Sequence, residues 1–215
     1  MKKRFYRALI RYLYVLTYFL AYLLSLVFFR LDIKGRGNVP SEGKLLVVAR
    51  HDSYWDPPLI GLAFGWYNRV QFIARRGLLR NPLFRFPVTF FATTIDRDNF
   101  GKSDLRKILE TFKEERIVCI LPEGTTKSGA SPKRGAIRMA ERTGNKFIPV
   151  KINFERKPSE FPFLLAPVEL IIGRPFSLDQ LKKEFEEQAE GSSGEGPGSN
   201  PELSQFLMKK IDGLV

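Results

Sequence analysis

The sequence predicts an α/β domain with a central, mostly parallel β-sheet flanked by helices, preceded by an N-terminal hydrophobic helical membrane segment. Short apolar runs of strand length alternate along the chain with amphipathic helical patterns, an order typical of parallel sheets. Polar residues that could take part in catalysis or ligand binding follow directly after three of these runs. Because ligands of open α/β sheets bind beyond the carboxyl ends of the strands, the same pattern predicts a site at that edge.

The first thirty residues form a segment of their own. An uncharged run of seventeen residues, Leu13 to Phe29, is preceded by basic residues and followed by Arg30. This length is at the short end of what a spanning helix needs, roughly 17 to 25 residues. The tyrosines in and before the run suit the headgroup level of a membrane. We expect this segment to anchor the chain, either by spanning a membrane or by inserting into one leaflet.

Two other interpretations of the segment are possible from the sequence. A cleaved signal peptide would need small residues at its end, where the chain has Phe29 and Arg30. An ordinary buried helix would rarely contain so long an apolar run studded with tyrosine. Cys119 is the single cysteine, so no disulfide can form within the chain, which fits a reducing compartment. We therefore expect the protein at the cytoplasmic face of the cell membrane.

The remaining elements follow in order after a stretch at 31–43, where glycine and proline indicate turns. Apolar runs predict strands at 44–49, 69–74, 92–95, 116–121, 146–152 and 168–173. Amphipathic patterns predict helices at 104–115 and 133–144. A glycine- and serine-rich stretch has the composition of a flexible linker. The predicted organisation is a membrane anchor at 1–30, an α/β domain at 31–190, the linker at 191–200 and a short C-terminal helix at 201–215.

The charge balance limits the partners. Thirty-five Lys and Arg residues against 23 Asp and Glu residues give a net charge of +12, which favours anionic partners such as nucleic acid, an acidic lipid surface or a phosphorylated substrate. No nucleic-acid-binding motif is recognisable, so no nucleic acid is expected as a partner. One histidine and scattered carboxylates make no metal-ligand set, and no cofactor is expected. A non-enzymatic basic binding module is an alternative to an enzyme.

The single histidine, His51, lies five residues before Asp56 in the stretch RHDSYWDPP. On an ideal helix these side chains would be about 140° apart, so a contact between them requires a bend. Pro57 and Pro58 favour a helix that begins at either of them, which leaves His51 and Asp56 in the preceding connection. A carboxylate on one imidazole nitrogen would leave the other free to accept a proton from a hydroxyl. The alternatives are a structural histidine and an Asp56 that only caps the helix.

Two more groups follow strand ends. Arg97 lies just beyond the strand at 92–95, and Glu123, Gly124 and Thr125 lie beyond the strand at 116–121. A guanidinium group and the backbone N–H groups of a glycine turn are phosphate ligands. The alternatives are a surface ion pair of Arg97 with a neighbouring aspartate, Asp96 or Asp98, and an ordinary turn at 123–124.

With these motifs the chain resembles the glycerolipid acyltransferases. HDSYWD matches their H-x-x-x-x-D motif, and three further blocks follow in the family's order: TTIDRD with its arginine, PEGT, and the proline segment IPV at 148–150. The resemblance covers about residues 45–152. Because it also has a hydrophobic N-terminal segment, the chain is similar to the bacterial 1-acyl-glycerol-3-phosphate acyltransferases.

The resemblance implies transfer of a fatty acyl group from acyl carrier protein or coenzyme A to the sn-2 hydroxyl of lysophosphatidic acid, giving phosphatidic acid. Anionic membrane lipid would be a further partner. His51 would be the general base and Asp56 would orient it. Arg97 would bind phosphate, helped by Lys127 or Arg75. The segment of Glu123, Gly124 and Thr125 would bind the acceptor, and charge repulsion suggests that Glu123 orients Arg97 or bonds an acceptor hydroxyl. A different lysolipid or glycerol phosphate acceptor is the alternative substrate.

The chain departs from the family pattern at two places. Many members have E-G-T-R-S where Thr126 and Lys127 follow Thr125 here, and many have lysine and glutamate where Arg75 and Arg76 stand. Other chemistries have weaker support. Cys119 lies in the middle of a predicted strand, where a free cysteine behaves as a small buried hydrophobe. No G-x-S-x-G motif occurs, and Asp96 occupies the position where a P-loop at 101–103 would need glycine.

Overall fold

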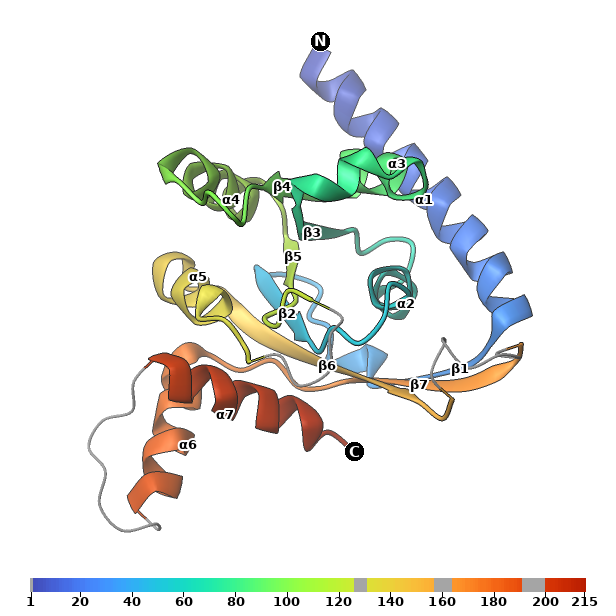
Figure 1. The fold of residues 1–215 in the computed structure, drawn as a ribbon. Coiled ribbons are helices and arrows are strands. Elements are labelled where there is room, and N and C mark those ends of the chain that lie inside the picture. The colour runs from blue at the N-terminus through green and yellow to red at the C-terminus, as the bar shows by residue number, and fades with distance from the viewer. Residues whose placement is uncertain (1, 126–130, 157–163, 191–199) are drawn as a thin grey trace.

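The computed structural model of the protein describes residues 2–125, 131–156, 164–190 and 200–215 (Figure 1). The strands in this part of the chain are β1 (Phe29–Lys34), β2 (Leu45–Ala49), β3 (Val70–Arg75), β4 (Ala92–Ile95), β5 (Ile117–Ile120), β6 (Lys146–Phe154) and β7 (Ala166–Ile172). They form one sheet in the order β1-β7-β6-β2-β5-β3-β4. All neighbouring pairs are parallel except β6 and β7, so the predicted mostly parallel sheet is confirmed.

Helices cover both faces of the sheet (Figure 1). The helices are α1 (Lys2–Phe28), α2 (Asp56–Phe64), α3 (Pro82–Phe91), α4 (Lys102–Glu114), α5 (Gly135–Thr143), α6 (Leu178–Glu190) and α7 (Asn200–Asp212), with 3₁₀ turns η1 (Arg36–Asn38) and η2 (Arg76–Arg80). One hydrophobic cluster joins the sheet to α2 and to the inner side of α1. A second joins the other face to α4, α5, α6 and α7.

The central strand β2 carries the chain to the predicted site. All five of its residues are buried, as expected for a continuous apolar run covered on both faces. It lies between β6 and β5, and Leu45 pairs with Lys146 on one side and Ile117 on the other. Since these strands run in the same direction, the residues that follow β2 and β5 emerge at the same edge.

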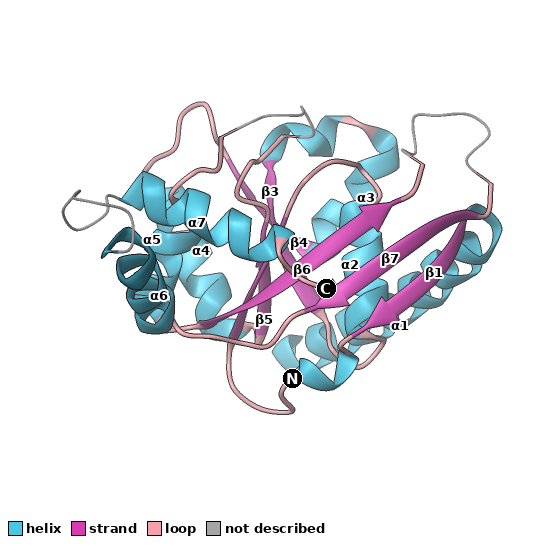
Figure 2. Ribbon diagram, turned by 90° about the horizontal axis from the view of Figure 1, so that it is seen from below, coloured by secondary structure: helices cyan, strands magenta, loops and turns pink. Residues whose placement is uncertain are grey.

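The first strand of the sheet was not predicted from the sequence. Residues Phe29–Lys34 form β1, an edge strand parallel to β7 (Figure 2). Phe29, Leu31 and Ile33 alternate with charged residues and pack on the first cluster, a period-two pattern that the nearby glycines obscured. Because α1 ends at Phe28 and β1 begins at the next residue, the predicted boundary at residue 30 falls inside a strand.

Two helices, α3 and α6, were not predicted from the sequence. α3 contains Pro82 at its start and Pro87 within it, so its composition argues against a helix. The C-terminal helix was predicted as an appendage at 201–215, but the structure gives Asn200–Asp212. Its side chains Leu203, Leu207 and Ile211 are buried in the second cluster. This helix is therefore part of the core.

The helix α1 is apolar but largely uncovered. Its segment Ala8–Phe28 has a mean hydropathy of 1.6, and only 11% of its most apolar stretch is buried. Tyr14 is an exception, because its ring is buried and its hydroxyl donates to the backbone oxygen of Asn68 at 3.2 Å. The interpretation as an ordinary buried helix is therefore wrong.

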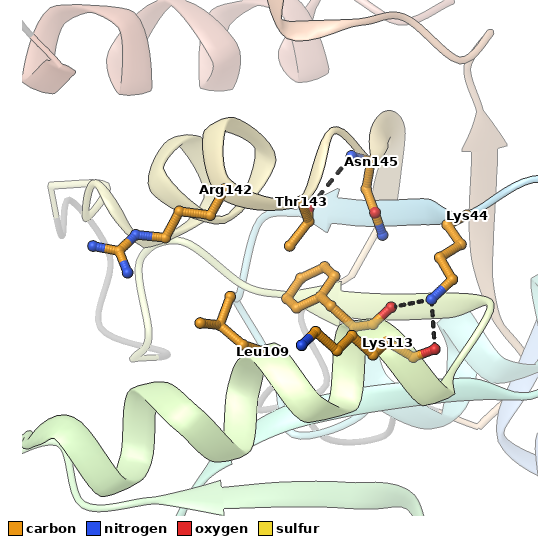
Figure 3. A pocket seen from close by; sticks show the side chains of 7 residues that line it. Lys44, Leu109, Lys113, Arg142, Thr143 and Asn145 are labelled. Carbon is orange, nitrogen blue, oxygen red and sulfur yellow. Dashed lines mark hydrogen bonds between the residues drawn. The ribbon is translucent and has the colours of Figure 1, made fainter.

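A hollow of about 470 Å³ is lined by residues that include Lys44, Leu109 and Arg142 (Figure 3). It lies at the amino end of β2, whereas His51 follows the carboxyl end of that strand. Lys44, just before β2, donates from Nζ to the carbonyl oxygens of Phe112 and Lys113, both at 2.6 Å. These carbonyls belong to the last turn of α4, so Lys44 caps that helix and offsets its dipole. The length of β2 separates this hollow from the candidate site.

Candidate active site

The loop between β2 and α2 places the histidine and the aspartate of the H-x-x-x-x-D motif. His51 lies two residues after the end of the buried strand β2, and α2 begins at Asp56, one or two residues before the predicted start. Pro57 and Pro58 lie in the first turn of α2, where proline costs no helical hydrogen bond. The Asp56 N–H donates to the carbonyl oxygen of Ser53 at 3.2 Å, which turns the chain back on itself.

This turn brings Asp56 into contact with His51. The distance between His51 Nδ1 and Asp56 Oδ2 is 3.1 Å. The same carboxylate oxygen accepts the backbone N–H groups of Asp52 and Ser53, both at 2.9 Å. The residue at the N-cap position is Trp55, without a side-chain cap, so the alternative that Asp56 only caps the helix is wrong. The carboxylate instead fixes the histidine loop.

The Asp56 carboxylate is buried, and within the described part of the chain only one of its two oxygens is hydrogen-bonded. Its side chain is 2% exposed, whereas that of His51 is 17% exposed. Among the described residues, no group bonds Asp56 Oδ1. Burial raises the pKa of the Asp56 carboxyl above its ordinary value, while hydrogen bonds from the His51 ring and the Ser53 N–H oppose that rise. The pairing thus costs desolvation energy, a feature common at functional sites.

Glu123 holds the same loop from the turn after β5. Its Oε2 accepts the backbone N–H of His51 at 2.9 Å, and its Oε1 accepts from Nη1 of Arg50 at 2.6 Å. Arg50 also donates two hydrogen bonds to Asp212 at the end of α7, both at 2.5 Å. The Glu123 side chain is only 5% exposed, so Arg50 supplies the positive charge that a buried carboxylate requires. These hydrogen bonds join the start of the His51 loop, the turn after β5 and the end of α7.

The suggestion that Glu123 orients Arg97 is wrong. Arg97 instead donates from Nη1 to the carbonyl oxygen of Gly124. Gly124 has a positive φ of 65°, and a Cβ placed there would lie 2.3 Å from Nη1 of Arg97. Glycine is thus favoured at this position both by its backbone conformation and by the approach of the guanidinium.

Arg97 has a charge without a carboxylate partner in the described part of the chain. The predicted alternative of an ion pair with Asp96 or Asp98 is wrong, because Asp98 pairs with Arg75 and Asp96 accepts backbone N–H groups of its own turn. Burial and the nearby Arg75 charge lower the pKa of Arg97. The uncompensated, partly buried guanidinium is the kind of group that binds phosphate.

Three other predicted binding residues, Thr125, Lys127 and Arg75, are not joined to His51 or Arg97 by these contacts. Thr125 ends the described stretch that begins at residue 2, and Lys127 lies outside the described residues. Arg75 is exposed and engaged by Asp98 at the end of β3. The structure therefore brings His51, Asp56 and Glu123 into direct contact, and Arg97 onto Gly124.

Cys119 offers no nucleophile to this site. It is fully enclosed in β5 with 1% exposure, and burial raises the pKa of its thiol far above the ordinary value. The thiolate that an acyl-enzyme would need is therefore disfavoured, in agreement with the expectation of a structural cysteine.

Comparison with known proteins gives the family. The protein-family model described as "Acyltransferase" matches residues 30–153, more than half of the chain. The chain belongs to the acyltransferase family. The non-enzymatic binding module is thereby set aside, and the resemblance found in the motifs is confirmed.

Curated relatives of this acyltransferase have related names. The 1-acyl-sn-glycerol-3-phosphate acyltransferase of Bacillus subtilis (strain 168) is 27% identical over 145 residues, which is 66% of this chain and 72% of the relative. The Borreliella burgdorferi protein of the same name is 24% identical over 129 residues, 57% of this chain and 51% of that protein. A probable enzyme of this name from Mycoplasma pneumoniae is 31% identical over 121 residues, 53% of this chain and 44% of that protein.

A solved structure shares the fold. The crystal structure of the 1-acyl-sn-glycerophosphate (LPA) acyltransferase PlsC from Thermotoga maritima superposes with a TM-score of 0.61 and 22% identity. The match covers 86% of this acyltransferase and 72% of that chain. At this identity, the likeness supports the fold.

Sequence reasoning missed Arg50 and Asp212. Arg50 directly precedes the motif histidine, and the buried Glu123 of the acyltransferase needs a cation, so a search for charge partners of the PEGT block would have found it. Asp212 lies 162 residues further along the chain. No sequence pattern indicates that α7 returns to the loop that carries His51.

Replacing Asp56 with asparagine should raise the melting temperature at neutral pH. Because the folded-state pKa of Asp56 is raised, the native state binds a proton more readily than the unfolded chain, and the cost of the buried charge is relieved as pH falls through that pKa. The advantage of Asp56→Asn over the parent should therefore shrink towards acidic pH. Tryptophan-detected melting across pH would test this, with exposed Asp52→Asn as control. A loss of stability at every pH would contradict it.

Replacing Arg50 with methionine should lower stability by about 2 kcal/mol, or roughly 4–8 °C in Tm, because Glu123 would stay buried without its cation. Asp212→Asn removes only an exposed partner of Arg50 and should cost less than about 1 kcal/mol. Adding Glu123→Gln to Arg50→Met should restore part of the loss. If urea unfolding gave equal losses in the free energy of unfolding for Arg50→Met and Asp212→Asn, Arg50 would not be the essential partner of Glu123.

Proposed function

We propose that the protein transfers a fatty acyl group from a thioester to the sn-2 hydroxyl of 1-acyl-glycerol-3-phosphate, giving phosphatidic acid. The observation that carries the proposal is the 3.1 Å contact between His51 Nδ1 and Asp56 Oδ2 beyond the carboxyl end of the central strand β2. The names of the three curated relatives support the choice of acceptor.

The proposed reaction needs one base. Asp56 accepts a hydrogen bond from the Nδ1–H group of His51, which leaves Nε2 without a proton and able to take the proton of the acceptor hydroxyl. The hydroxyl oxygen then forms a bond to the thioester carbonyl carbon. The tetrahedral intermediate collapses as the carbon–sulfur bond breaks, and the imidazolium returns its proton to the thiolate. An ester and a free thiol result, and His51 ends in its starting state.

Phosphate binding is assigned to Arg97. Its guanidinium has no carboxylate partner among the described residues, and its hydrogen bond to the Gly124 carbonyl joins it to the turn whose preceding residue, Glu123, holds the His51 backbone. The acceptor's phosphate on Arg97 would thus be tied in position to its hydroxyl at His51. Arg75 and Lys127 are proposed as additional cations. Glu123 acts by holding the loop, because its two oxygens are engaged by Arg50 and by the His51 N–H.

Membrane association is assigned to α1. The segment Ala8–Phe28 is long enough to cross a bilayer, but Tyr14, Tyr18 and Phe28 pack against the α/β domain. A helix that lies along its own domain cannot be surrounded by lipid. We therefore propose that α1 inserts its exposed side into the cytoplasmic leaflet, where the net positive charge of the chain favours anionic lipid.

The thiol carrier is proposed to be acyl carrier protein or coenzyme A. Both are anionic, and the basic chain suits either. A comparison of the two donors belongs in the first activity measurement.

The activity test compares the parent with His51→Ala in detergent. The parent should form phosphatidic acid from lysophosphatidic acid and a long-chain acyl thioester, and the variant should lose at least about a hundredfold in rate because it lacks the base. Matching melting temperatures would verify that the variant is folded. Equal activity of the two proteins would refute base catalysis. No product from the parent with either donor would refute this acceptor and favour another lysolipid or glycerol phosphate.

Replacing Gly124 with alanine should weaken acceptor binding. The new Cβ would displace the Arg97 guanidinium, which lies 2.3 Å away, so KM for lysophosphatidic acid should rise by about tenfold, as expected for the loss of one charged hydrogen bond. Gly144→Ala is the matched control, because Gly144 has a similar positive φ of 67° and no heavy atom lies within 4 Å of its Cβ position. An unchanged KM for Gly124→Ala would argue against phosphate binding by Arg97.

A further inference from the structure

The helix α3 exposes apolar side chains beside the catalytic loop. Leu83 is 76% exposed and Phe86 is 46% exposed. Phe84 of the same helix stacks on Tyr54, with ring centroids 5.3 Å apart, and Tyr54 is itself 62% exposed. Tyr54 lies three residues after His51. We call Tyr54, Leu83 and Phe86 the α3 face.

Aromatic contacts connect the α3 face to α1. The ring of Tyr14 on α1 meets Phe91 at the end of α3, with centroids 5.6 Å apart. Phe91 in turn lies 6.5 Å from Phe86. The two helices meet on the outer side of the domain (Figure 1). Aromatic contacts therefore join α3 to α1 at its end, through Phe91, and to the loop that carries His51 near its start, through Phe84.

Positive charge flanks the α3 face. Arg80 precedes α3 and Arg85 lies within it, and both are exposed. In the residues that the structure describes, neither forms an ion pair with a carboxylate. Exposed apolar side chains bordered by arginine are typical of a surface that enters the boundary between headgroups and acyl chains of an anionic bilayer.

We propose that the α3 face is a second lipid-contacting surface, which inserts into the leaflet beside α1 and holds the catalytic loop at the bilayer. The proposal builds on the function proposed above, because it assigns how the lipid acceptor reaches His51. Lysophosphatidic acid has its acyl chain in the leaflet and its glycerol phosphate at the headgroup level. With the α3 face inserted, the acceptor moves only a short way from the leaflet to the histidine.

A probe on α3 tests the contact directly. Cys119 is buried, so a cysteine introduced by Leu83→Cys in the full-length chain can be labelled selectively with the environment-sensitive dye nitrobenzoxadiazole. Vesicles rich in phosphatidylglycerol should shift the dye's emission to the blue, and pure phosphatidylcholine vesicles should do so less. Lys183→Cys on α6 is the control, since that side chain is 78% exposed and lies on the other face of the sheet; its dye should not respond.

A kinetic variant tests the consequence. Leu83→Asp should raise KM about tenfold for lysophosphatidic acid presented in anionic vesicles, because a charged residue replaces an inserted apolar one. It should leave unchanged the turnover of a short-chain lysophosphatidic acid dispersed as monomers. Val215→Asp places the same charge at another exposed apolar residue and should affect neither substrate.

Three results would overturn the proposal. The Leu83 dye could stay unshifted while the protein sediments with the vesicles, which would leave α1 as the contact. The dye could respond only to an acidic acyl carrier protein, which would make the α3 face a protein-docking surface. Leu83→Asp could impair vesicle and monomeric substrates equally. Failure of the proposed function is distinguishable, because the parent would then convert neither acceptor while the dye result would still report on the membrane.

Discussion

A buried carboxylate needs hydrogen-bond donors, and this need organises the site. Asp56 takes its donors from the loop that carries His51, so satisfying the carboxylate also folds the loop. Glu123, in the turn after β5, is also buried and accepts a hydrogen bond from the backbone N–H of the same histidine. Each carboxylate is costly to bury alone. Together they fix the ring and the backbone of one residue.

The sheet explains why these groups can meet. β2 and β5 are parallel neighbours, so the loops that leave them point to the same edge. The arginine that follows β4 reaches the turn after β5 through the carbonyl of Gly124. The core thus acts as a rigid frame, and the chemistry lies on short connections at its edge. Two of these connections contain residues whose conformations are fixed locally, by the prolines of α2 and by the positive φ of Gly124.

Local patterns made much of this predictable. The apolar runs gave the central strands, and the motif with its two prolines indicated that His51 and Asp56 meet in a bend. Contacts between distant segments could not be predicted, because they depend on how elements pack. Two such contacts are the ion pair of Arg50 with Asp212 and the ion pair of Glu123 with Arg50 rather than Arg97. α3 was missed for a different reason, since Pro87 argues against the helix that the surrounding structure supports.

The link between α7 and Arg50 also has a consequence for biosynthesis. Among the described elements, α1 leaves the ribosome before the others and α7 leaves it after them. Asp212 is made 162 residues after Arg50, a delay on the order of ten seconds at common rates of translation. With α1 inserted in the leaflet as proposed above, the nascent protein would be held at the membrane well before α7 can complete the charge network of Arg50, Glu123 and Asp212.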